Sequence, residues 1–166
     1  MRSTLPPPPL RVLIAEAHPI VVLGLADLLH TLGYMLVGSV ASGQEAILAA
    51  GEHQPDLMLV DVDLKGEMDG IAAAVEIHTR LGIRCVVLPE QVDAMMRARA
   101  AEAVPIAVLD KTSPMSVIAD ALRIAPPRTA HRPWPLRAEG PLRNLLEPVR
   151  VGVSPLRFSQ PSTRRT

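Results

Sequence analysis

Five short apolar runs recur along the chain, and segments whose apolar residues have helical spacing separate them. The runs are RVLIA (11–15), YMLVGSV (34–40), LMLVDV (57–62), IRCVVLP (83–89) and IAVLD (106–110). Strands that are apolar on both faces and alternate with helices belong to parallel sheets covered by helices on both sides. Right-handed crossovers leave few topologies for such a sheet. We therefore expect an α/β fold, a flavodoxin-like doubly wound sheet of five parallel strands in the order 2-1-3-4-5 with helices on both faces.

Capping and turn residues mark the helices of this pattern. Ser42 is suited to cap the second helix and Asp69 the third, because their side-chain oxygens can accept hydrogen bonds from the free N–H groups of a first turn. Pro19 fits the first turn of the first helix, which Gly33 ends. The predicted helices cover about residues 19–32, 43–51, 71–81, 91–101 and 114–122.

Charge and proline divide the chain into unequal parts. Residues 1–125 contain 9 Lys and Arg against 15 Asp and Glu, whereas residues 126–166 contain 8 Arg against 2 Glu and 8 of the 17 prolines. The net charges of −6 and +6 cancel over the whole chain. We predict a Pro-rich leader (1–10), a folded domain (11–125) and a basic, Pro-rich C-terminal tail (126–166) that is disordered, because it has little apolar surface to offset the entropy of ordering.

The composition excludes several classes of protein. Cys85 is the single cysteine, so neither an intramolecular disulfide nor a cysteine-based zinc site can form. No apolar run reaches the ~18 residues of a membrane span, and the prolines before the first run argue against a secretory signal. The three aromatic residues offer little stacking surface for single-stranded nucleic acid. We expect a cytoplasmic protein that does not contact a membrane.

Charged residues follow three of the predicted strands. Glu16 comes directly after the first strand, Asp61 ends the third, and Lys111 follows the fifth. Because binding sites in open parallel sheets lie beyond the carboxyl ends of the strands, these side chains should converge. Two carboxylates and a lysine suit phosphoryl transfer, since a carboxylate can be the nucleophile, Mg²⁺ binds carboxylates, and a lysine pairs with phosphoryl oxygens.

Two segments of the chain carry a resemblance to a known family. The stretch PDLMLVDVDLKGEMDGIAAA (55–74) resembles the phosphoacceptor strand and following loop of the receiver domains of two-component response regulators. DKTSP (110–114) is similar to the segment that follows the fifth strand in many of these domains. The resemblance covers about residues 11–124, and the family's order of elements agrees with the order expected from periodicity.

The resemblance implies a role for each site residue. Asp61 falls on the phosphorylated aspartate, Lys111 on the lysine of the site, and Glu16 on the first residue of an acidic pair. Glu16, Asp61 and the backbone carbonyl of Asp63 would then hold Mg²⁺ weakly. The implied partners are a histidine kinase or a phosphotransfer protein, and an output partner that the sequence does not identify.

Four positions depart from the family's pattern. Ala17 stands where the main metal-ligating aspartate is expected, and Pro89 replaces the Thr or Ser that hydrogen-bonds the phosphoryl group. Val108 replaces an aromatic residue that usually changes rotamer on phosphorylation, and Thr112 follows the lysine in place of a proline. The nucleophile and the cation are present, but most of the residues that transmit the signal are not.

Two functions follow from these residues. The first is a receiver domain in a two-component phosphorelay, which accepts a phosphoryl group on Asp61. The alternative is a degenerate pseudo-receiver that acts as a phosphorylation-independent protein-interaction module. We expect no enzyme activity on a separate substrate. We also expect no DNA binding, because the Arg-rich tail lacks helix-turn-helix spacing and contains prolines throughout.

Overall fold

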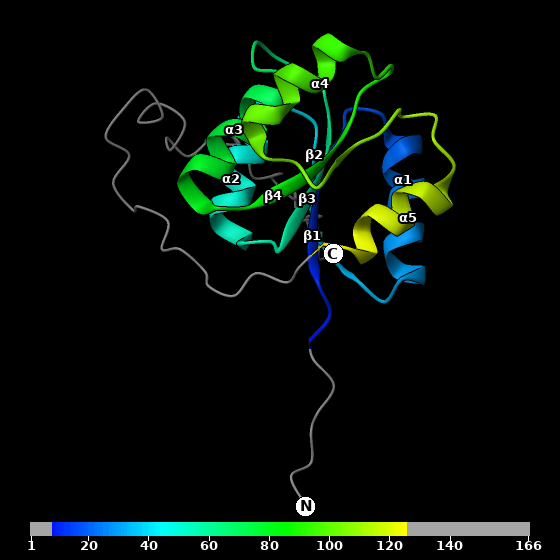
Figure 1. Ribbon diagram of the computed structural model, residues 1–166. Helices are drawn as coiled ribbons and strands as arrows, with labels where there is room; N and C mark the ends of the chain where they lie inside the picture. Colours follow the sequence, from blue (N-terminus) through cyan, green and yellow to red (C-terminus); the bar gives the residue numbers. More distant parts are fainter. Residues whose placement is uncertain (1–7, 126–166) are drawn as a thin grey trace, which may run out of the picture. The chain divides into compact units, whose positions relative to one another are not determined.

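The central sheet has the predicted strand order. The computed structural model of the chain describes residues 8–125, so residues 1–7 of the predicted leader and the whole predicted tail lie outside the described residues. Within this part, five parallel strands form one sheet in the order β2-β1-β3-β4-β5 (Figure 1). The strands are β1 (Arg11–Ala15), β2 (Met35–Val40), β3 (Leu57–Asp61), β4 (Arg84–Leu88) and β5 (Ala107–Val108).

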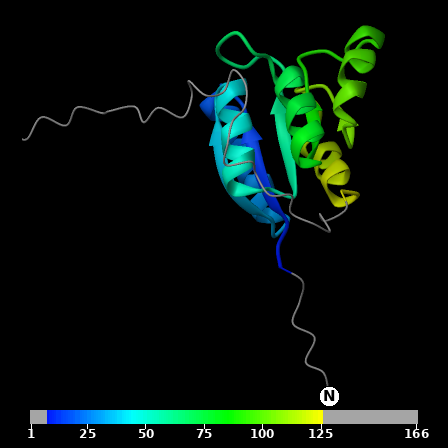
Figure 2. The same ribbon diagram turned by 90° about the vertical axis from the view of Figure 1, so that its left-hand side faces the viewer.

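Helices cover both faces of this sheet. They are α1 (Pro19–Thr31), α2 (Gly43–His53), α3 (Gly70–Leu81), α4 (Ala94–Ala100) with the short 3-10 turn η1 (Ala101–Ala103), and α5 (Met115–Arg123). Helices α1 and α5 lie on one face, and α2, α3 and α4 lie on the other (Figure 1). Figure 2, turned by 90°, shows α2 and α3 side by side in front of the sheet. The flavodoxin-like prediction is therefore confirmed for the described residues.

The expected caps begin two of the helices. The Ser42 hydroxyl accepts a hydrogen bond from the Glu45 backbone N–H, and the Glu45 carboxylate accepts one from the Ser42 N–H in return. Asp69 Oδ1 accepts from the Ala72 backbone N–H at 2.9 Å at the start of α3. Each bond satisfies an N–H of the first turn that has no partner inside the helix, which fixes where the helix begins.

Two elements are shorter than their sequence patterns predict. Helix α4 begins at Ala94 rather than near residue 91, because Asp93 caps it by accepting from the Met96 N–H. Strand β5 has two residues instead of the five in IAVLD, although the backbone N–H groups of Ile106 and Leu109 still bond to β4 carbonyls. β5 is an edge strand that pairs only with β4, so few ladder bonds extend it.

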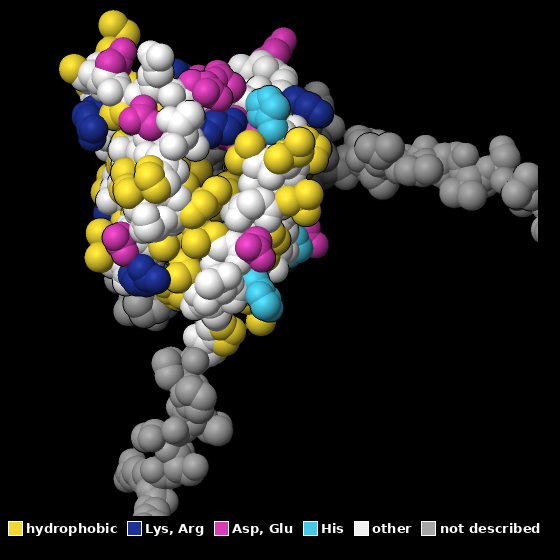
Figure 3. Space-filling model, turned by 90° about the vertical axis from the view of Figure 1, so that its right-hand side faces the viewer, with side chains coloured by type: hydrophobic (Ala, Val, Ile, Leu, Met, Phe, Trp, Pro, Cys, Tyr) yellow, Lys and Arg dark blue, Asp and Glu magenta, His cyan; other side chains and the backbone are white. Residues whose placement is uncertain are grey.

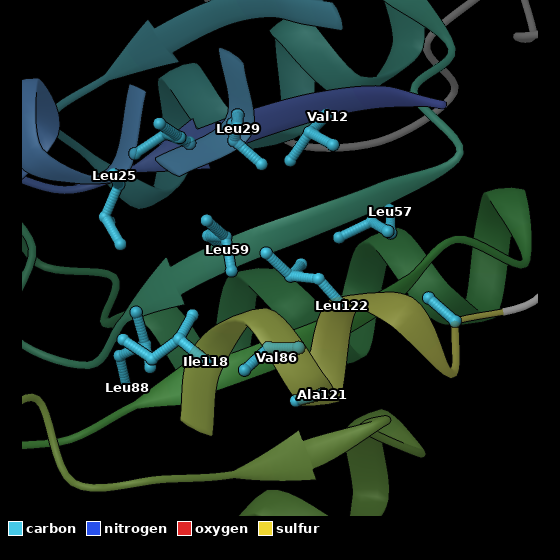
Figure 4. Close-up of a cluster of buried hydrophobic side chains, with 12 residues drawn as sticks. Val12, Leu25, Leu29, Leu57, Leu59, Val86, Leu88, Ile118, Ala121 and Leu122 are labelled. Carbon is cyan, nitrogen blue, oxygen red and sulfur yellow. The ribbon is translucent and has the colours of Figure 1, made fainter. Parts of the chain in front are cut away.

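Alternate residues of the strands build a core on each side of the sheet. Figure 4 shows the cluster between the sheet and the helices α1 and α5. Its labelled members are Val12, Leu25, Leu29, Leu57, Leu59, Val86, Leu88, Ile118, Ala121 and Leu122. The intervening strand residues Leu13, Met58 and Val87 are also buried, on the opposite face. Burial on both faces explains why the strands read as unbroken apolar runs.

The outer surface of the α1–α5 layer keeps some apolar side chains exposed. Figure 3 views this side, where hydrophobic groups gather among polar ones. Ile20 is 83% exposed and Leu23 is 70% exposed on α1, and Met115 and Val117 of α5 are also exposed. Among residues 8–125, no helix is long and apolar enough to cross a membrane.

Candidate functional site

Three charged side chains meet at the carboxyl edge of the sheet. Glu16 directly follows β1, Asp61 is the last residue of β3, and Lys111 lies three residues beyond β5. The Lys111 Nζ is 2.8 Å from Asp61 Oδ2 and 2.8 Å from Glu16 Oε2. Glu16 and Asp61 are 3% and 1% exposed, and they are the buried charged residues of the described chain. The structure thus brings together the three residues that the strand order predicts to converge.

Backbone bonds between neighbouring loops hold Lys111 in this position. Its backbone N–H donates to the Pro89 carbonyl at 2.7 Å, at the end of β4. The carboxylate of Asp110 accepts from the Val92 N–H at 2.7 Å, which ties the loop after β5 to the loop after β4. The ammonium group is therefore carried on backbone that is anchored at Lys111 and at the residue before it.

Gly70 allows α3 to begin directly against the residue that ends β3. A Cβ atom built on Gly70 would lie 1.8 Å from the Asp61 carbonyl oxygen and 2.8 Å from Val60 Cγ1. Its N–H donates to the Val62 carbonyl at 3.0 Å. No side chain fits between backbone segments this close, so glycine at this position lets the loop fold back over Asp61.

The ion pairs fix the charges of Glu16 and Lys111. Burial alone would raise the pKa of Glu16, but hydrogen bonds from Lys111 and from the backbone and ring of His18 outweigh burial and hold the pKa below its ordinary value. Burial would likewise lower the pKa of Lys111, yet its bonds to Asp61 and Glu16 raise it above the ordinary value. At neutral pH, the site therefore contains an ionised Glu16 beside a protonated lysine.

One buried carboxylate oxygen of the cluster has neither a hydrogen bond nor an ion pair among the described residues. Asp61 Oδ2 accepts from Lys111, whereas Asp61 Oδ1 is buried and unpartnered among the described residues. A buried acceptor without a partner costs about 1–3 kcal/mol, so such an atom marks a place where a ligand or a reacting group fits. Two carboxylates with a free oxygen match the donor set that Mg²⁺ prefers.

The structure also places His18, which follows β1 by three residues, in the cluster. The His18 Nδ1 lies 2.8 Å from Glu16 Oε1, and the His18 backbone N–H donates to the same oxygen at 2.7 Å. Glu16, His18 and Asp61 each offer a ligand atom within 4.8 Å of the others. The side chain of Asp63 is exposed and outside this group. The sequence feature that could have indicated this contact is the two-residue spacing of Glu16 and His18 directly after a strand.

A surface cavity opens beside Lys111 and His18. It has a volume of about 500 Å³, and its lining includes His18, Ile20, Glu90, Lys111 and Thr112. The exposed Ile20 of α1 and the Lys111 side chain face the same cavity.

Comparisons with known proteins decide the family. A family model for the response regulator receiver domain matches residues 12–123. The chain belongs to this family. Transcriptional regulatory protein PdtaR of Mycobacterium tuberculosis is 40% identical over 119 residues, which are 70% of this chain and 57% of PdtaR. Response regulator protein VraR of Staphylococcus epidermidis is 36% identical over 69% of this chain and 55% of VraR. The chain thus spans little more than half the length of these relatives.

Solved structures agree with this assignment. The signal receiver domain of a modulated diguanylate cyclase from Desulfovibrio desulfuricans has a TM-score of 0.65 and 26% identity, covering 70% of this chain and 93% of that one. The signal receiver domain of NarL from Mycobacterium tuberculosis has a TM-score of 0.65 and 25% identity, covering 70% and 95%. The family match therefore extends to the arrangement of the sheet and helices.

Three of the positions that depart from the receiver pattern lie in β5 or in the loops that follow β4 and β5. Pro89 contributes only its carbonyl, which accepts from Lys111, because proline has neither an N–H nor a hydroxyl. Val108 is half-buried in the edge strand β5, and Thr112 is exposed next to the lysine. This receiver domain therefore keeps its charged groups but lacks hydroxyl and aromatic side chains at Pro89 and Val108.

The glycine at the start of α3 gives a first prediction. Gly70→Ala should destabilise the fold by about 1–3 kcal/mol, because its Cβ collides with the backbone of Asp61. Gly24→Ala is the matched control, since a Cβ there lies 3.5 Å from Met115 Cε and alanine favours the helix interior. We expect urea unfolding to show a loss for the first variant and a gain of up to about 1 kcal/mol for the second. Equal changes in the free energy of unfolding for the two variants would contradict the close approach of Gly70 to the Asp61 backbone.

The lowered pKa of Glu16 gives a second prediction. Ionised Glu16 stabilises the fold above its unfolded-state pKa, and this contribution is lost as the pH falls through the lower folded-state pKa. In urea unfolding without divalent ions from about pH 7 to about pH 3, Glu16→Gln should lose stability less steeply than the wild type. Glu67→Gln, at an exposed position, should follow the wild type. A Glu16→Gln profile parallel to the wild type would refute the assignment.

Proposed function

We propose that Asp61 accepts a phosphoryl group from a histidine kinase or a phosphotransfer protein. Phosphorylation of an aspartate is the general role of receiver domains, and this chain is one of them. The observation that carries the proposal is Asp61 Oδ1, a buried carboxylate oxygen without a hydrogen-bond partner in the described part of the chain. Its neighbour Oδ2 is held by Lys111, so the carboxylate is oriented with one oxygen free to react.

The transfer forms one bond and breaks another. Asp61 Oδ1 would attack the phosphorus of a phosphohistidine, and the P–N bond would break with its electron pair leaving on the imidazole nitrogen, which then takes a proton. The product is an acyl phosphate on Asp61. Phosphoryl transfer demands mainly positioning and electrostatic stabilisation, and a carboxylate fixed by a buried lysine supplies the positioning.

Lys111 would neutralise charge as the phosphoryl group arrives. Its ammonium has three N–H groups and is protonated at neutral pH, so it can donate to Asp61, to Glu16 and to a phosphoryl oxygen. The carboxylates of Glu16 and Asp61 and the backbone carbonyl of Asp63 would hold Mg²⁺ weakly. When bound, that ion would offset the negative charge of the carboxylates and the phosphoryl oxygens.

Receiver domains are signalling modules, and we infer no catalysis on a separate substrate for this chain. We also propose that it acts in the cytoplasm. PdtaR is named a transcriptional regulatory protein, but the chain covers 57% of that relative. The Arg-rich sequence beyond residue 125 lacks helix-turn-helix spacing, so we propose no DNA-binding role for it.

A mass measurement tests the phosphoacceptor. After incubation with Mg²⁺ and a small phosphodonor such as acetyl phosphate, the intact protein should gain the mass of one phosphoryl group. Asp61→Asn should abolish the gain because an amide is not a nucleophile here. Asp63→Asn, an exposed carboxylate in the same loop, should keep it. Labelling that persists in Asp61→Asn or disappears in Asp63→Asn would reject Asp61 as the acceptor.

Pro89 favours a second candidate, the phosphorylation-independent interaction module. In that case the domain would bind its partners without a conformational change on phosphorylation, because no side-chain hydroxyl at position 89 contacts a phosphoryl oxygen. A modification shifts a conformational equilibrium only by its differential interaction with the two states. The absence of that hydroxyl, and of an aromatic group at Val108, reduces the difference well below the ~5.5 kcal/mol needed for a near-complete shift.

Amide NMR spectra measure that response. With beryllofluoride as a phosphoryl mimic, we expect Asp61-dependent shifts confined to the loops around Asp61 and Lys111. Helix α4, β5 and α5 should change little, for the reason given above. Asp61→Asn is the control and should show no shifts. Strong Asp61-dependent changes throughout α4 and β5 would contradict the weakened response and indicate an ordinary switching receiver.

A further inference from the structure

The side chain of His18 lies beside the buried carboxylates of the site. Its Nδ1 is 2.8 Å from Glu16 Oε1, and the ligand atoms of Glu16, His18 and Asp61 lie within 4.8 Å of one another. The imidazole is 64% exposed, whereas both carboxylates are buried. The group thus consists of two buried oxygen donors and one nitrogen donor at their solvent side.

The spacing of these atoms suits a bound ion. Ligand atoms that bind one metal ion at about 2.0–2.2 Å are themselves about 3–4 Å apart. The ligand atoms of Glu16, His18 and Asp61 all lie within 4.8 Å of one another, and an ion bound between Glu16 and His18 would replace the 2.8 Å hydrogen bond that now joins them. The buried Asp61 Oδ1, unpartnered among residues 8–125, is a further donor whose hydrogen-bonding capacity is unused.

The donor types select the kind of ion. Mg²⁺ prefers oxygen ligands throughout, whereas an imidazole nitrogen suits Zn²⁺, Fe²⁺ or Ni²⁺. Ala17, between the two donors Glu16 and His18, has no ligand atom in its side chain. The nitrogen of His18 is therefore the third side-chain donor where a third carboxylate oxygen is lacking.

We propose that this site binds a divalent first-row transition-metal ion such as Zn²⁺, with His18 Nδ1 as a ligand beside Glu16 and Asp61. The inference rests on the proposed function to the extent that both use the Asp61 carboxylate. It goes further because His18, and not only the acidic residues, sets which ion is preferred.

Calorimetric titration of the full chain with Zn²⁺ and with Mg²⁺ tests the proposal. Any site made of nitrogen and oxygen donors binds Zn²⁺ more tightly than Mg²⁺, so the ratio of the two affinities in the wild type decides nothing by itself. The deciding quantity is the change in the ratio of Zn²⁺ affinity to Mg²⁺ affinity when His18 is substituted. His18→Ala should weaken Zn²⁺ binding at least about tenfold and change Mg²⁺ binding by less than about twofold. His30→Gln, an exposed histidine at the end of α1, should alter neither.

Two further measurements complete the test. His18→Asn should give the same loss and keep a residue that favours the helix N-cap, so a folding defect in His18→Ala does not decide the outcome. In the wild type, Zn²⁺ should shift the His18 ring-nitrogen resonances, and that shift should be absent in Asp61→Asn. Equal losses of Zn²⁺ and Mg²⁺ affinity in both His18 variants, or an unshifted His18 ring, would overturn the proposal.

These results are independent of the phosphoacceptor assignment. A protein that is phosphorylated on Asp61, but whose Zn²⁺ affinity does not depend on His18, overturns only the metal inference. A protein that binds Zn²⁺ through His18, but takes up no phosphoryl group, supports this inference and rejects the proposed function.

Discussion

The ammonium group of Lys111 between two buried carboxylates is the interaction on which the rest of the site depends. Glu16 and Asp61 are nearly inaccessible to solvent, and charges in such places must be paired and hydrogen-bonded. The three residues follow β1, β3 and β5, which are not consecutive neighbours in the chain. The site therefore depends on this strand order, because another order of strands would leave a buried carboxylate without its cation.

A second constraint acts on the shape of the loop that follows Asp61. Because Gly70 has no side chain, α3 can begin in contact with the Asp61 carbonyl. Asp69 and Asp93 cap the starts of α3 and α4. These backbone features place Asp61 without contact to its Oδ1. Lys111 and His18, but not the buried Asp61, line the cavity beside the site, and Pro89 offers neither an N–H nor a hydroxyl there.

The sequence predicts the sheet order and the convergence of Glu16, Asp61 and Lys111, because both depend on periodicity and on the common edge of parallel strands. It also predicts the caps at Ser42 and Asp69, because their side-chain oxygens can accept hydrogen bonds from first-turn N–H groups. It does not predict the contact of His18 with Glu16, since that contact depends on a backbone turn and a rotamer in the loop after β1. β5 is short because it lies at the edge of the sheet, and α4 starts late because Asp93 caps it. Local residue propensities indicate neither effect. The roles of the site residues remain predictions.

The stability of Lys111→Met measures the central pairing most directly. Removing the cation leaves two buried carboxylates facing each other, so the free energy of unfolding should fall by about 3–5 kcal/mol in urea titrations at neutral pH. Adding Glu16→Gln and Asp61→Asn to the same variant should recover a large part of that loss, because the neutral amides need no counter-ion. A Lys111→Met protein within about 0.5 kcal/mol of the wild type, or a triple variant no more stable than the single one, would contradict the account.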